Sequence, residues 1–286
     1  MDKLIDGKAL AESIQQELKE EIITKNLKPN LAVVLVGDDS ASQIYVNLKK
    51  KACHQAGIEF HEYLLDADCT EEHVLGVIDF LNKDNHIDAI LIQLPLPKKF
   101  DTDKVIKAMS PAKDVDGFHP QNIEKFLTNQ SGFVPGLSLG IFKLIVSTEE
   151  NLQNKQAVII AKSDIFYRPL AKLLNDQGAT TTIAHPDDKD IKTKTSQADI
   201  LVAAAGQPFF VTADMVKDNA IVIDVGTNKI DNNYVVGDVD YSAVFQKASH
   251  ITPVPGGVGP MTVAMLLYNT VRLAEGPEQS RRAEKK

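Results

Sequence analysis

Residues 40–57, SASQIYVNLKKKACHQAG, decide how the first part of the chain is organised. They follow a strand-like run, open with hydroxyl-bearing residues and close on a glycine, which are the start and stop signals of a helix. Tyr45 and Lys49 are four residues apart, so they share one face of that helix. A phenol beside a partly desolvated amine can transfer protons, because burial lowers the pKa of an ammonium group. The alternative is a solvated basic face, since Lys50 and Lys51 follow directly.

The composition excludes several classes of protein. A chain of 286 residues is long enough for two domains or one large α/β domain, and 43% hydrophobic with 24% charged residues is typical of a soluble globular protein. Its net charge of −8 argues against nucleic-acid binding, which needs a positive field. Two cysteines, Cys53 and Cys69, cannot form a disulfide framework, and no metal-ligand cluster is present, so we expect no metal. Without a signal peptide or a membrane-length apolar run, we expect a cytoplasmic protein with no membrane partner.

Outward from the 40–57 helix, strands and helices alternate. The expected elements are a helix over 6–25, strands over 31–36, 58–65 and 88–93, and a helix over 70–83. The run LAVVLV at 31–36 is apolar throughout, as expected of a strand buried on both faces of a parallel sheet. This alternation predicts a mostly parallel sheet with helices on its faces.

Two loops of the first part contain candidate functional residues. The segment QLPLP at 93–97 stops the third strand at its carboxyl end, where open α/β sheets bind ligands. The segment KDVDGF at 113–118 combines acidic side chains with a glycine turn. A simple Asx turn that caps the helix near Pro120 is the competing interpretation of the second loop.

Beyond about residue 135 the alternation begins again. The expected elements are helices over 137–146, 169–176 and 262–273, and strands over 157–161, 179–184, 199–204 and 220–225. This order outlines a Rossmann-type domain, although the turn AKSDIFYRP at 161–169 lacks the usual glycine fingerprint. The segment at 252–262, TPVPGGVGPMT, contains three prolines and three glycines, and so constrained a backbone allows close approach to a ligand.

Taken together, these segments resemble the bifunctional methylenetetrahydrofolate dehydrogenase/methenyltetrahydrofolate cyclohydrolase family, from near the N-terminus to about residue 274. The matching strings are 36–42, Tyr45 with Lys49, 93–97, 114–117, 206–208, 237–239 and 252–262. A short-chain dehydrogenase also uses a Tyr-x-x-x-Lys pair, but places it far downstream of a glycine-rich turn. The order in this chain is the reverse, which excludes that family.

The resemblance implies a fold of two α/β domains with a cleft between them. Residues 1–134, with a C-terminal helix over about 262–274, would form the folate-binding catalytic domain. Residues 135–261 would form a Rossmann-like NAD(P)-binding domain, and the charged tail 275–286 would be disordered. A homodimer formed through the dinucleotide domains is also implied.

The activity implied by the resemblance is two steps of cytoplasmic one-carbon metabolism, which serves purine, histidine and methionine biosynthesis. NADP would oxidise 5,10-methylenetetrahydrofolate to the methenyl compound, and water would then open that cation to 10-formyltetrahydrofolate. Lys49 would be the general base or orient the water, and Gln93 would hydrogen-bond Lys49. Tyr45 would stack on the folate, and Asp116 would accept hydrogen bonds from the pterin. The remaining implied contacts are Pro255, Gly256 and Gly257 for the substrate, and Ala161, Lys162, Ser163, Pro186, Thr227, Gly259 and Thr262 for the cofactor.

Departures from the family pattern concentrate on the cofactor side. Residues 135–138 (PGLS) replace Pro-Cys-Thr-Pro, residues 161–163 (AKS) replace Gly-Arg-Ser, and Tyr167 stands in place of a second glycine. Pro186 replaces a serine that holds the 2′-phosphate, and two aspartates follow it. We therefore expect NADP to bind weakly, unless the loop has shifted to compensate. The alternatives are a cyclohydrolase-only or NAD-preferring enzyme and a folate-binding protein without turnover.

Overall fold

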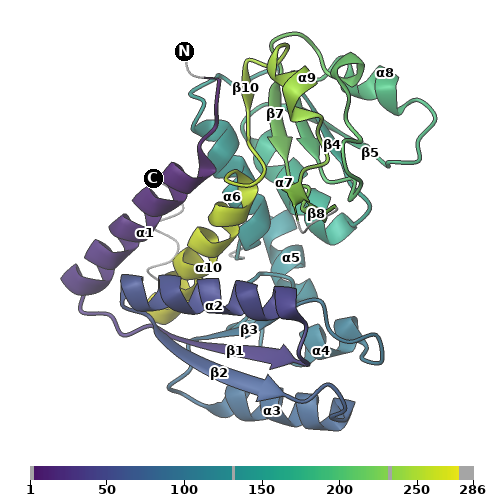
Figure 1. Cartoon of the computed structure of the whole chain (residues 1–286). Helices are drawn as coiled ribbons and strands as arrows, with labels where there is room; N and C mark the ends of the chain where they lie inside the picture. The colour runs from purple at the N-terminus through teal and green to yellow at the C-terminus, as the bar shows by residue number, and fades with distance from the viewer. Residues whose placement is uncertain (1–2, 131–132, 231–233, 277–286) are drawn as a thin grey trace. The chain divides into compact units, whose positions relative to one another are not determined.

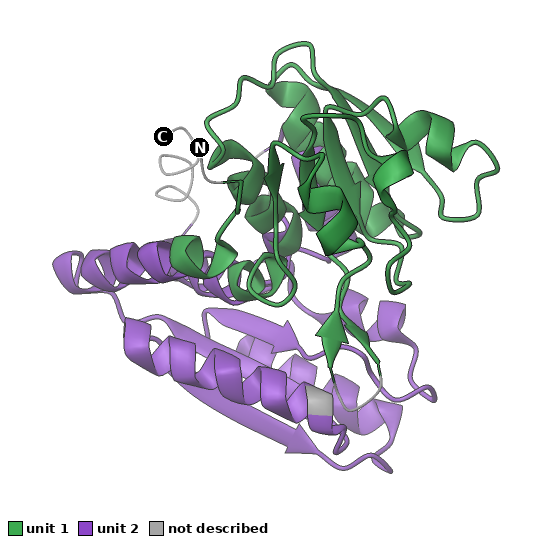
Figure 2. Ribbon diagram, turned by 45° about the horizontal axis from the view of Figure 1, so that its top comes forward, with its two compact units in different colours: residues 1–11, 137–262 green, residues 12–136, 263–286 purple. Residues whose placement is uncertain are grey.

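The computed structural model describes residues 3–130, 133–230 and 234–276 (Figure 1). The chain divides into two compact units (Figure 2). Unit 1 comprises Met1–Ala11 and Leu137–Thr262, and unit 2 comprises Glu12–Gly136 and Val263–Lys286. Of the predicted disordered tail 275–286, Glu275 is instead the last residue of α10, with a buried side chain, and residues 277–286 lie outside the described residues. Two long helices, α1 (Gly7–Thr24) and α10 (Val258–Glu275), contribute residues to both units.

Unit 2 is built on a three-stranded parallel sheet with the strand order β2-β1-β3. Its strands are β1 (Asn30–Val36), β2 (Glu59–Leu65) and β3 (Ala89–Ile92). Helix α2 (Ser40–Ala56) covers one face of the sheet and α3 (Glu71–Lys83) the other (Figure 1). Because both faces of the central strand β1 are covered, its residues from the second onward are all buried, as its uninterrupted apolar run predicts.

The ends of α2 follow from its sequence. Asp39 precedes the helix, and its carboxylate accepts the Ser42 N–H at 2.8 Å. Gly57 follows the helix with φ +86°, a left-handed conformation that favours glycine. The expected helix over 40–57 is therefore present, and its capping signals are the physical reason.

Unit 1 contains a five-stranded parallel sheet with the order β10-β7-β6-β4-β5. Its strands are β4 (Gln156–Ile160), β5 (Thr180–Ala184), β6 (Ile200–Ala203), β7 (Ile221–Asp224) and β10 (His250–Ile251). Strand β4 lies between β5 and β6, so the chain builds first toward one edge and then toward the other. This reversal next to the first strand is the switch point at which Rossmann-type sheets bind ligands.

Further elements connect these frameworks. In unit 2 they are α4 (Thr102–Ala108) and α5 (Pro120–Leu127), and from the unit boundary onward they are α6 (Gly136–Val146), α7 (Asp164–Asp176), α8 (Ile191–Thr195), the 3₁₀-helix η1 (Ala213–Met215), β8 (Asn228–Lys229), β9 (Val235–Val236) and α9 (Tyr241–Phe245). The helix expected near Pro120 is α5, whereas the sequence did not predict α4, α8 and α9, because elements this short carry little periodicity.

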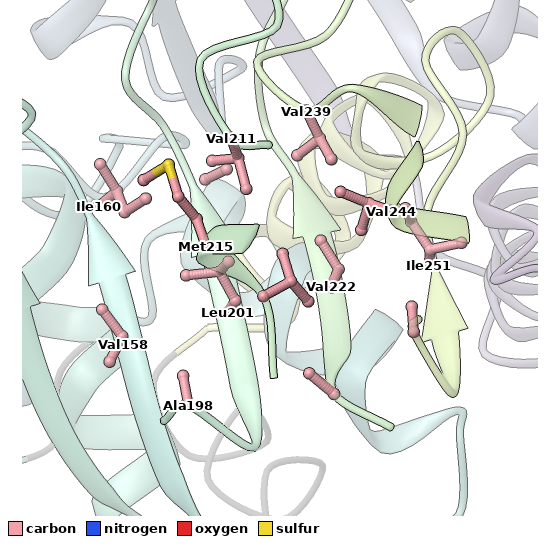
Figure 3. Packing of buried hydrophobic residues seen from close by; sticks show 14 of the residues in the cluster. Val158, Ile160, Ala198, Leu201, Val211, Met215, Val222, Val239, Val244 and Ile251 are labelled. Atoms are coloured by element: carbon pink, nitrogen blue, oxygen red, sulfur yellow. The ribbon is translucent and has the colours of Figure 1, made fainter. Parts of the chain in front are cut away.

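One face of the unit 1 sheet is closed by a dry apolar cluster (Figure 3). Val158 of β4, Leu201 of β6 and Val222 of β7 contribute to it from neighbouring strands. Met215 and Val244 cover these side chains from the segments that follow the strands. Burial of such side chains contributes about 1.5–3 kcal/mol each, so this cluster is a main source of the unit's stability.

Two helices begin earlier than the sequence predicts. Helix α7 starts at Asp164, not at Pro169, which lies inside the helix. Helix α10 starts at Val258, not at Thr262. The first N–H groups of a helix have no partner within the helix, so a proline in the first turn loses no hydrogen bond. Pro260 occupies such a position in α10. Among the described residues no helix is both long and apolar enough to cross a membrane.

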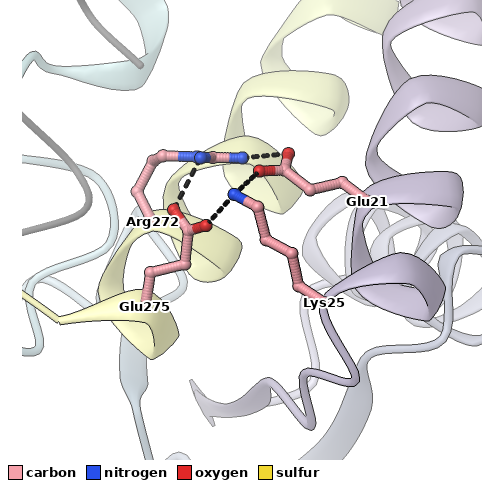
Figure 4. A network of polar contacts seen from close by, with 4 residues as sticks. All are labelled: Glu21, Lys25, Arg272 and Glu275. Atoms are coloured by element: carbon pink, nitrogen blue, oxygen red, sulfur yellow. Dashed lines mark hydrogen bonds and ion pairs between the residues drawn. The ribbon is translucent and has the colours of Figure 1, made fainter. Parts of the chain in front are cut away.

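A network of ion pairs joins α1 to α10 within unit 2 (Figure 4). Arg272 of α10, only 4% exposed, bonds Glu275 at 2.6 Å and pairs with Glu21 of α1. Lys25 pairs with both glutamates from the solvent side. The alternation of charges leaves each buried carboxylate with a cation beside it.

We expect Arg272→Ala to lower the free energy of unfolding by about 3–5 kcal/mol, because it leaves two partly or fully buried carboxylates short of a cation. Lys25→Ala is the matched control at the exposed end of the same network, and its loss should stay within about 1 kcal/mol. Urea unfolding of both variants measures the difference. Equal losses would contradict a special role for the buried arginine.

Candidate active site

Helix α2 places the Tyr45 and Lys49 side chains at the edge of unit 2. Val46 and Cys53 are buried on the side of the helix that packs on the sheet, at 1% and 0% exposure. Tyr45 is 41% exposed, and Lys49, one helical turn further on, is half-buried. The lysine therefore occupies the border between the core and the surface, which the interpretation as a solvated basic face does not describe.

Lys49 has a neutral hydrogen-bond partner on the neighbouring strand. Its Nζ donates to Oε1 of Gln93 at 2.9 Å, and Gln93 is 8% exposed directly after β3. The Gln93 Nε2 donates to the Leu94 carbonyl oxygen at 2.6 Å, which fixes the amide with its oxygen toward the lysine. Because the glutamine carries no charge, it orients the lysine without stabilising the ammonium form as a carboxylate would.

Burial lowers the pKa of Lys49, while the nearby Asp116 carboxylate acts in the opposite direction. Burial also raises the pKa of the Cys53 thiol to about 12, so this neighbour stays protonated and uncharged. Cys53 lies four residues after Lys49, and the spacing 45–49–53 could have identified it in the sequence. Burial thus makes the free amine, which is the form that can accept a proton, more accessible than in an exposed lysine.

The loop that carries Asp116 is shaped by its neighbour Asp114. Asp114 is fully buried and accepts the Gly117 N–H at 3.1 Å, the His119 N–H at 2.7 Å and the Asn122 side-chain amide at 2.9 Å. The structural turn that the sequence allowed for this loop is therefore formed by Asp114. Asp116 remains available for chemistry.

Asp116 is half-buried, and burial raises the pKa of its carboxyl to about 6, against the lowering effect of Lys49 and with a further increase from Asp114. Asn269 of α10 supports the same loop by donating to the Val115 carbonyl at 2.8 Å. Lys49, Gln93 and Asp116 thus form one interacting group, and Tyr45 shares the helix face of Lys49.

In unit 1, Ala161 to Ser163 form the turn between β4 and α7. Ala161 is buried and donates its N–H to the Ala184 carbonyl at 3.0 Å, whereas Lys162 and Ser163 are exposed. Asp164 is the first residue of α7, a position that the sequence interpretation overlooked. A carboxylate at a helix N-terminus competes with any anionic ligand for the same positive potential.

In the segment after β5, an aspartate pairs with the charge of Lys194. Pro186 is buried and has no N–H to donate, and Asp187 has an 82% exposed side chain. Asp188 accepts the His185 N–H at 3.0 Å and Lys194 Nζ at 2.9 Å. The Lys194 charge is therefore already compensated inside the loop.

The proline- and glycine-rich segment after β10 is tightly packed within unit 1. Gly256 has φ +112°, and a Cβ on Gly257 would lie 2.6 Å from the Pro253 carbonyl oxygen. Thr262 lies in α10 and donates its hydroxyl to the Gly259 carbonyl at 2.7 Å. The remaining predicted cofactor residue, Thr227, is exposed after β7.

The fold and these side chains define a class of protein with two parallel α/β units. One unit has the Rossmann strand order, and the other carries a lysine–glutamine–aspartate group. Comparison with known families is more specific. Residues 5–116 match the tetrahydrofolate dehydrogenase/cyclohydrolase catalytic domain, and residues 135–278 match the NAD(P)-binding domain of the same family. The chain belongs to this family, which confirms the resemblance found in the sequence.

Similar proteins cover nearly the whole chain. "Bifunctional protein FolD" of Wolinella succinogenes is 46% identical over 282 residues, 97% of this chain and 99% of that protein. The crystal structure of the bifunctional enzyme FolD from Campylobacter jejuni superposes with a TM-score of 0.91 at 46% identity, covering 95% of this chain and 98% of that one. The Trypanosoma brucei FolD structure, a complex with NADP cofactor and inhibitor, gives 0.90 at 35% identity over 98% of each chain.

The charges around Asp116 predict how its pKa responds to substitution of its neighbours. Its pKa of about 6 should rise by about one unit in Lys49→Met, because a nearby cation that favours the carboxylate is lost. In Asp114→Asn it should fall, because a like charge is lost. Carboxyl NMR titration of the folded variants measures both shifts, and an unchanged value in Lys49→Met would contradict the electrostatic contact.

Proposed function

We propose that this protein oxidises 5,10-methylenetetrahydrofolate to 5,10-methenyltetrahydrofolate with NADP and hydrolyses the product to 10-formyltetrahydrofolate. The observation that carries the proposal is the Lys49–Gln93 hydrogen bond with Asp116 in electrostatic contact. Family membership supports the same pair of reactions, since the related FolD proteins are described as bifunctional.

In the hydrolytic step, water adds to the methenyl cation and must lose a proton. Lys49 is suited to accept that proton, because its lowered pKa makes the free amine more accessible. A bound cation would lower the pKa of Lys49 further by repelling the ammonium form. Gln93 holds the amine in place throughout, since its own charge does not change.

Substrate binding would use Asp116 and Tyr45. The Asp116 carboxylate can accept hydrogen bonds from the donor edge of the pterin, and the exposed Tyr45 ring offers a flat surface for stacking. Pro255, Gly256 and Gly257 are proposed as further substrate contacts, because their constrained backbone allows close approach.

A nicotinamide dinucleotide supplies the hydride acceptor when bound. Lys162 and Ser163 are exposed at the start of α7, where a cation and main-chain N–H groups fit a pyrophosphate. The 2′-phosphate of NADP would meet Lys162, but Pro186 offers it no donor and Asp187 repels it. Ala161, Thr227, Gly259 and Thr262 complete the proposed cofactor contacts.

We place the reaction in cytoplasmic one-carbon metabolism, where formyl and methylene groups serve purine, histidine and methionine biosynthesis. We also propose a homodimer formed through the dinucleotide-binding unit, without a nucleic-acid or membrane partner. In support, β5 is the last strand of the described sheet, so it is an edge strand at which a second copy could pack. Sedimentation of the purified protein measures the oligomeric state.

Two assays on the purified protein test the proposed activities separately. The first follows methylenetetrahydrofolate oxidation with NADP and with NAD, and the second follows methenyltetrahydrofolate hydrolysis without any dinucleotide. Hydrolysis without oxidation would favour the cyclohydrolase-only alternative, and binding without either reaction would favour a folate-binding protein.

Lys49→Met should reduce methenyltetrahydrofolate hydrolysis by about a hundred- to ten-thousandfold, because the positioned proton acceptor is lost. Lys50→Met is the matched control, since Lys50 is a neighbouring lysine that pairs with Glu62 at 2.6 Å. The control should retain hydrolysis close to wild type. Wild-type hydrolysis by folded Lys49→Met protein would remove Lys49 from the mechanism.

NADP should bind weakly to the wild type and at least about tenfold more tightly to a Tyr167→Gly, Pro186→Ser double variant. The glycine removes a bulky side chain near the start of α7, and the serine restores a hydroxyl for the 2′-phosphate. NAD should gain less, because it lacks that phosphate. Equilibrium binding measurements with both dinucleotides test this prediction. Tight NADP binding by the wild type without a gain in the double variant would disprove that Tyr167 and Pro186 weaken NADP binding.

A further inference from the structure

Asp238 is a fully buried carboxylate that the proposed chemistry does not use. Its Oδ2 accepts the Gly206 N–H at 2.9 Å, and its Oδ1 accepts the Gln207 N–H at 3.1 Å and the Asn228 side-chain amide at 2.8 Å. The three donors come from two segments, the loop after β6 and strand β8, which follows β7. A single buried side chain therefore fixes both segments.

Asp238 is itself held by a second buried carboxylate, Asp224 at the end of β7. Asp224 accepts the Asp238 N–H at 2.9 Å and the Val239 N–H at 3.0 Å. There is no room for a side chain at Gly237, where a Cβ would lie 1.8 Å from the Asp224 carboxylate. The position of Asp238 is thus fixed by the strand framework.

Both segments lie where the Rossmann fold binds ligands. They follow the carboxyl ends of β6 and β7, and β6 is the neighbour of β4 at the switch point of the sheet. Gly206 has φ +68°, and no atom lies within 4 Å of where its Cβ would be. The Gly206 loop therefore borders open space beyond the end of the sheet.

The direction of the hydrogen bonds determines what this loop offers to a ligand. In a trans peptide the carbonyl points opposite to the N–H. Because the Gly206 and Gln207 N–H groups both point at Asp238, the carbonyl oxygens of Ala205 and Gly206 point away from it. Two adjacent acceptors on the outer side suit a ligand that carries an amide NH₂, such as the carboxamide of a nicotinamide ring.

We propose that Asp238 is a positioning residue for the nicotinamide half of the dinucleotide, which it never touches. It orients the 205–207 backbone so that carbonyl acceptors face the carboxamide. The inference rests on dinucleotide binding by unit 1 as proposed above, and it assigns recognition of the nicotinamide half to the loop after β6.

The test is a comparison of two ligands that differ only in the nicotinamide, NADP and 2′-phospho-ADP-ribose. In Asp238→Asn, an NH₂ group replaces one of the accepting oxygens, so at least one of the loop N–H bonds is lost. We expect the dissociation constant of NADP to rise about tenfold and that of 2′-phospho-ADP-ribose to change little. Amide hydrogen exchange at Gly206 and Gln207 should accelerate, and methenyltetrahydrofolate hydrolysis without dinucleotide should keep its wild-type rate.

Asp240→Asn is the matched control from the same segment. Asp240 accepts the Ala243 N–H at 3.2 Å and the Ser242 hydroxyl at 2.9 Å, so it caps α9 and has no bond to the 206–207 loop. It should lower the thermal midpoint without a ligand-specific effect. If Asp238→Asn does not fold, Asn228→Ala removes one of the three bonds to Asp238 and should shift NADP affinity in the same direction by a smaller factor.

Three outcomes would overturn the inference. Equal weakening of both ligands in Asp238→Asn would make Asp238 a purely structural residue. Unchanged affinity for both, with accelerated exchange, would separate the loop from nicotinamide recognition. A wild type that binds neither ligand would refute this inference together with the dinucleotide part of the proposed function, whereas either of the first two outcomes, found with a wild type that binds NADP, refutes this inference alone.

Discussion

Loops in both units depend on buried carboxylates that accept main-chain N–H groups. Asp114 does this in unit 2, and Asp224 and Asp238 do it in unit 1. Loops beyond the ends of parallel strands have no ladder partner for their N–H groups, and a buried N–H without an acceptor is costly. One carboxylate can accept several such bonds, so it satisfies a whole turn with a single side chain. Without these residues, the strands would remain but the loops would lose their defined shape.

The same burial that makes these turns possible also tunes the site chemistry. It lowers the pKa of Lys49 and raises the pKa of Asp116 to about 6, so both groups move toward the pH range in which proton transfer is efficient. Pairing Lys49 with the neutral Gln93 preserves this effect, because an ionised partner would have restored the ammonium form. Desolvation and the choice of an uncharged partner therefore act together.

The two units differ in the residues at their loops. Unit 2 contains the Tyr45, Lys49, Gln93 and Asp116 set, whereas in unit 1 Asp164 is the first residue of α7 and Pro186 follows β5. The fold of unit 1 is nevertheless that of the family, as superposition over nearly the whole chain shows. A sheet tolerates changes in its surface loops because much of its stability comes from the buried apolar cluster on its face.

The sequence by itself determined the parallel α/β class, the caps of α2, the shared face of Tyr45 and Lys49, and the family. These features are local, since periodicity, capping and four-residue spacing are all encoded within one turn or one strand. Only the tertiary structure decided which aspartate of the 114–116 pair forms the turn, where α7 and α10 begin, and that Asp238 holds both the loop after β6 and strand β8. Its bond to Gly206 spans 32 residues, whereas the Lys49–Gln93 bond, which spans 44, was expected from the family resemblance. Contacts at such separations depend on how the strands are ordered in space, and no local pattern in the chain specifies that order.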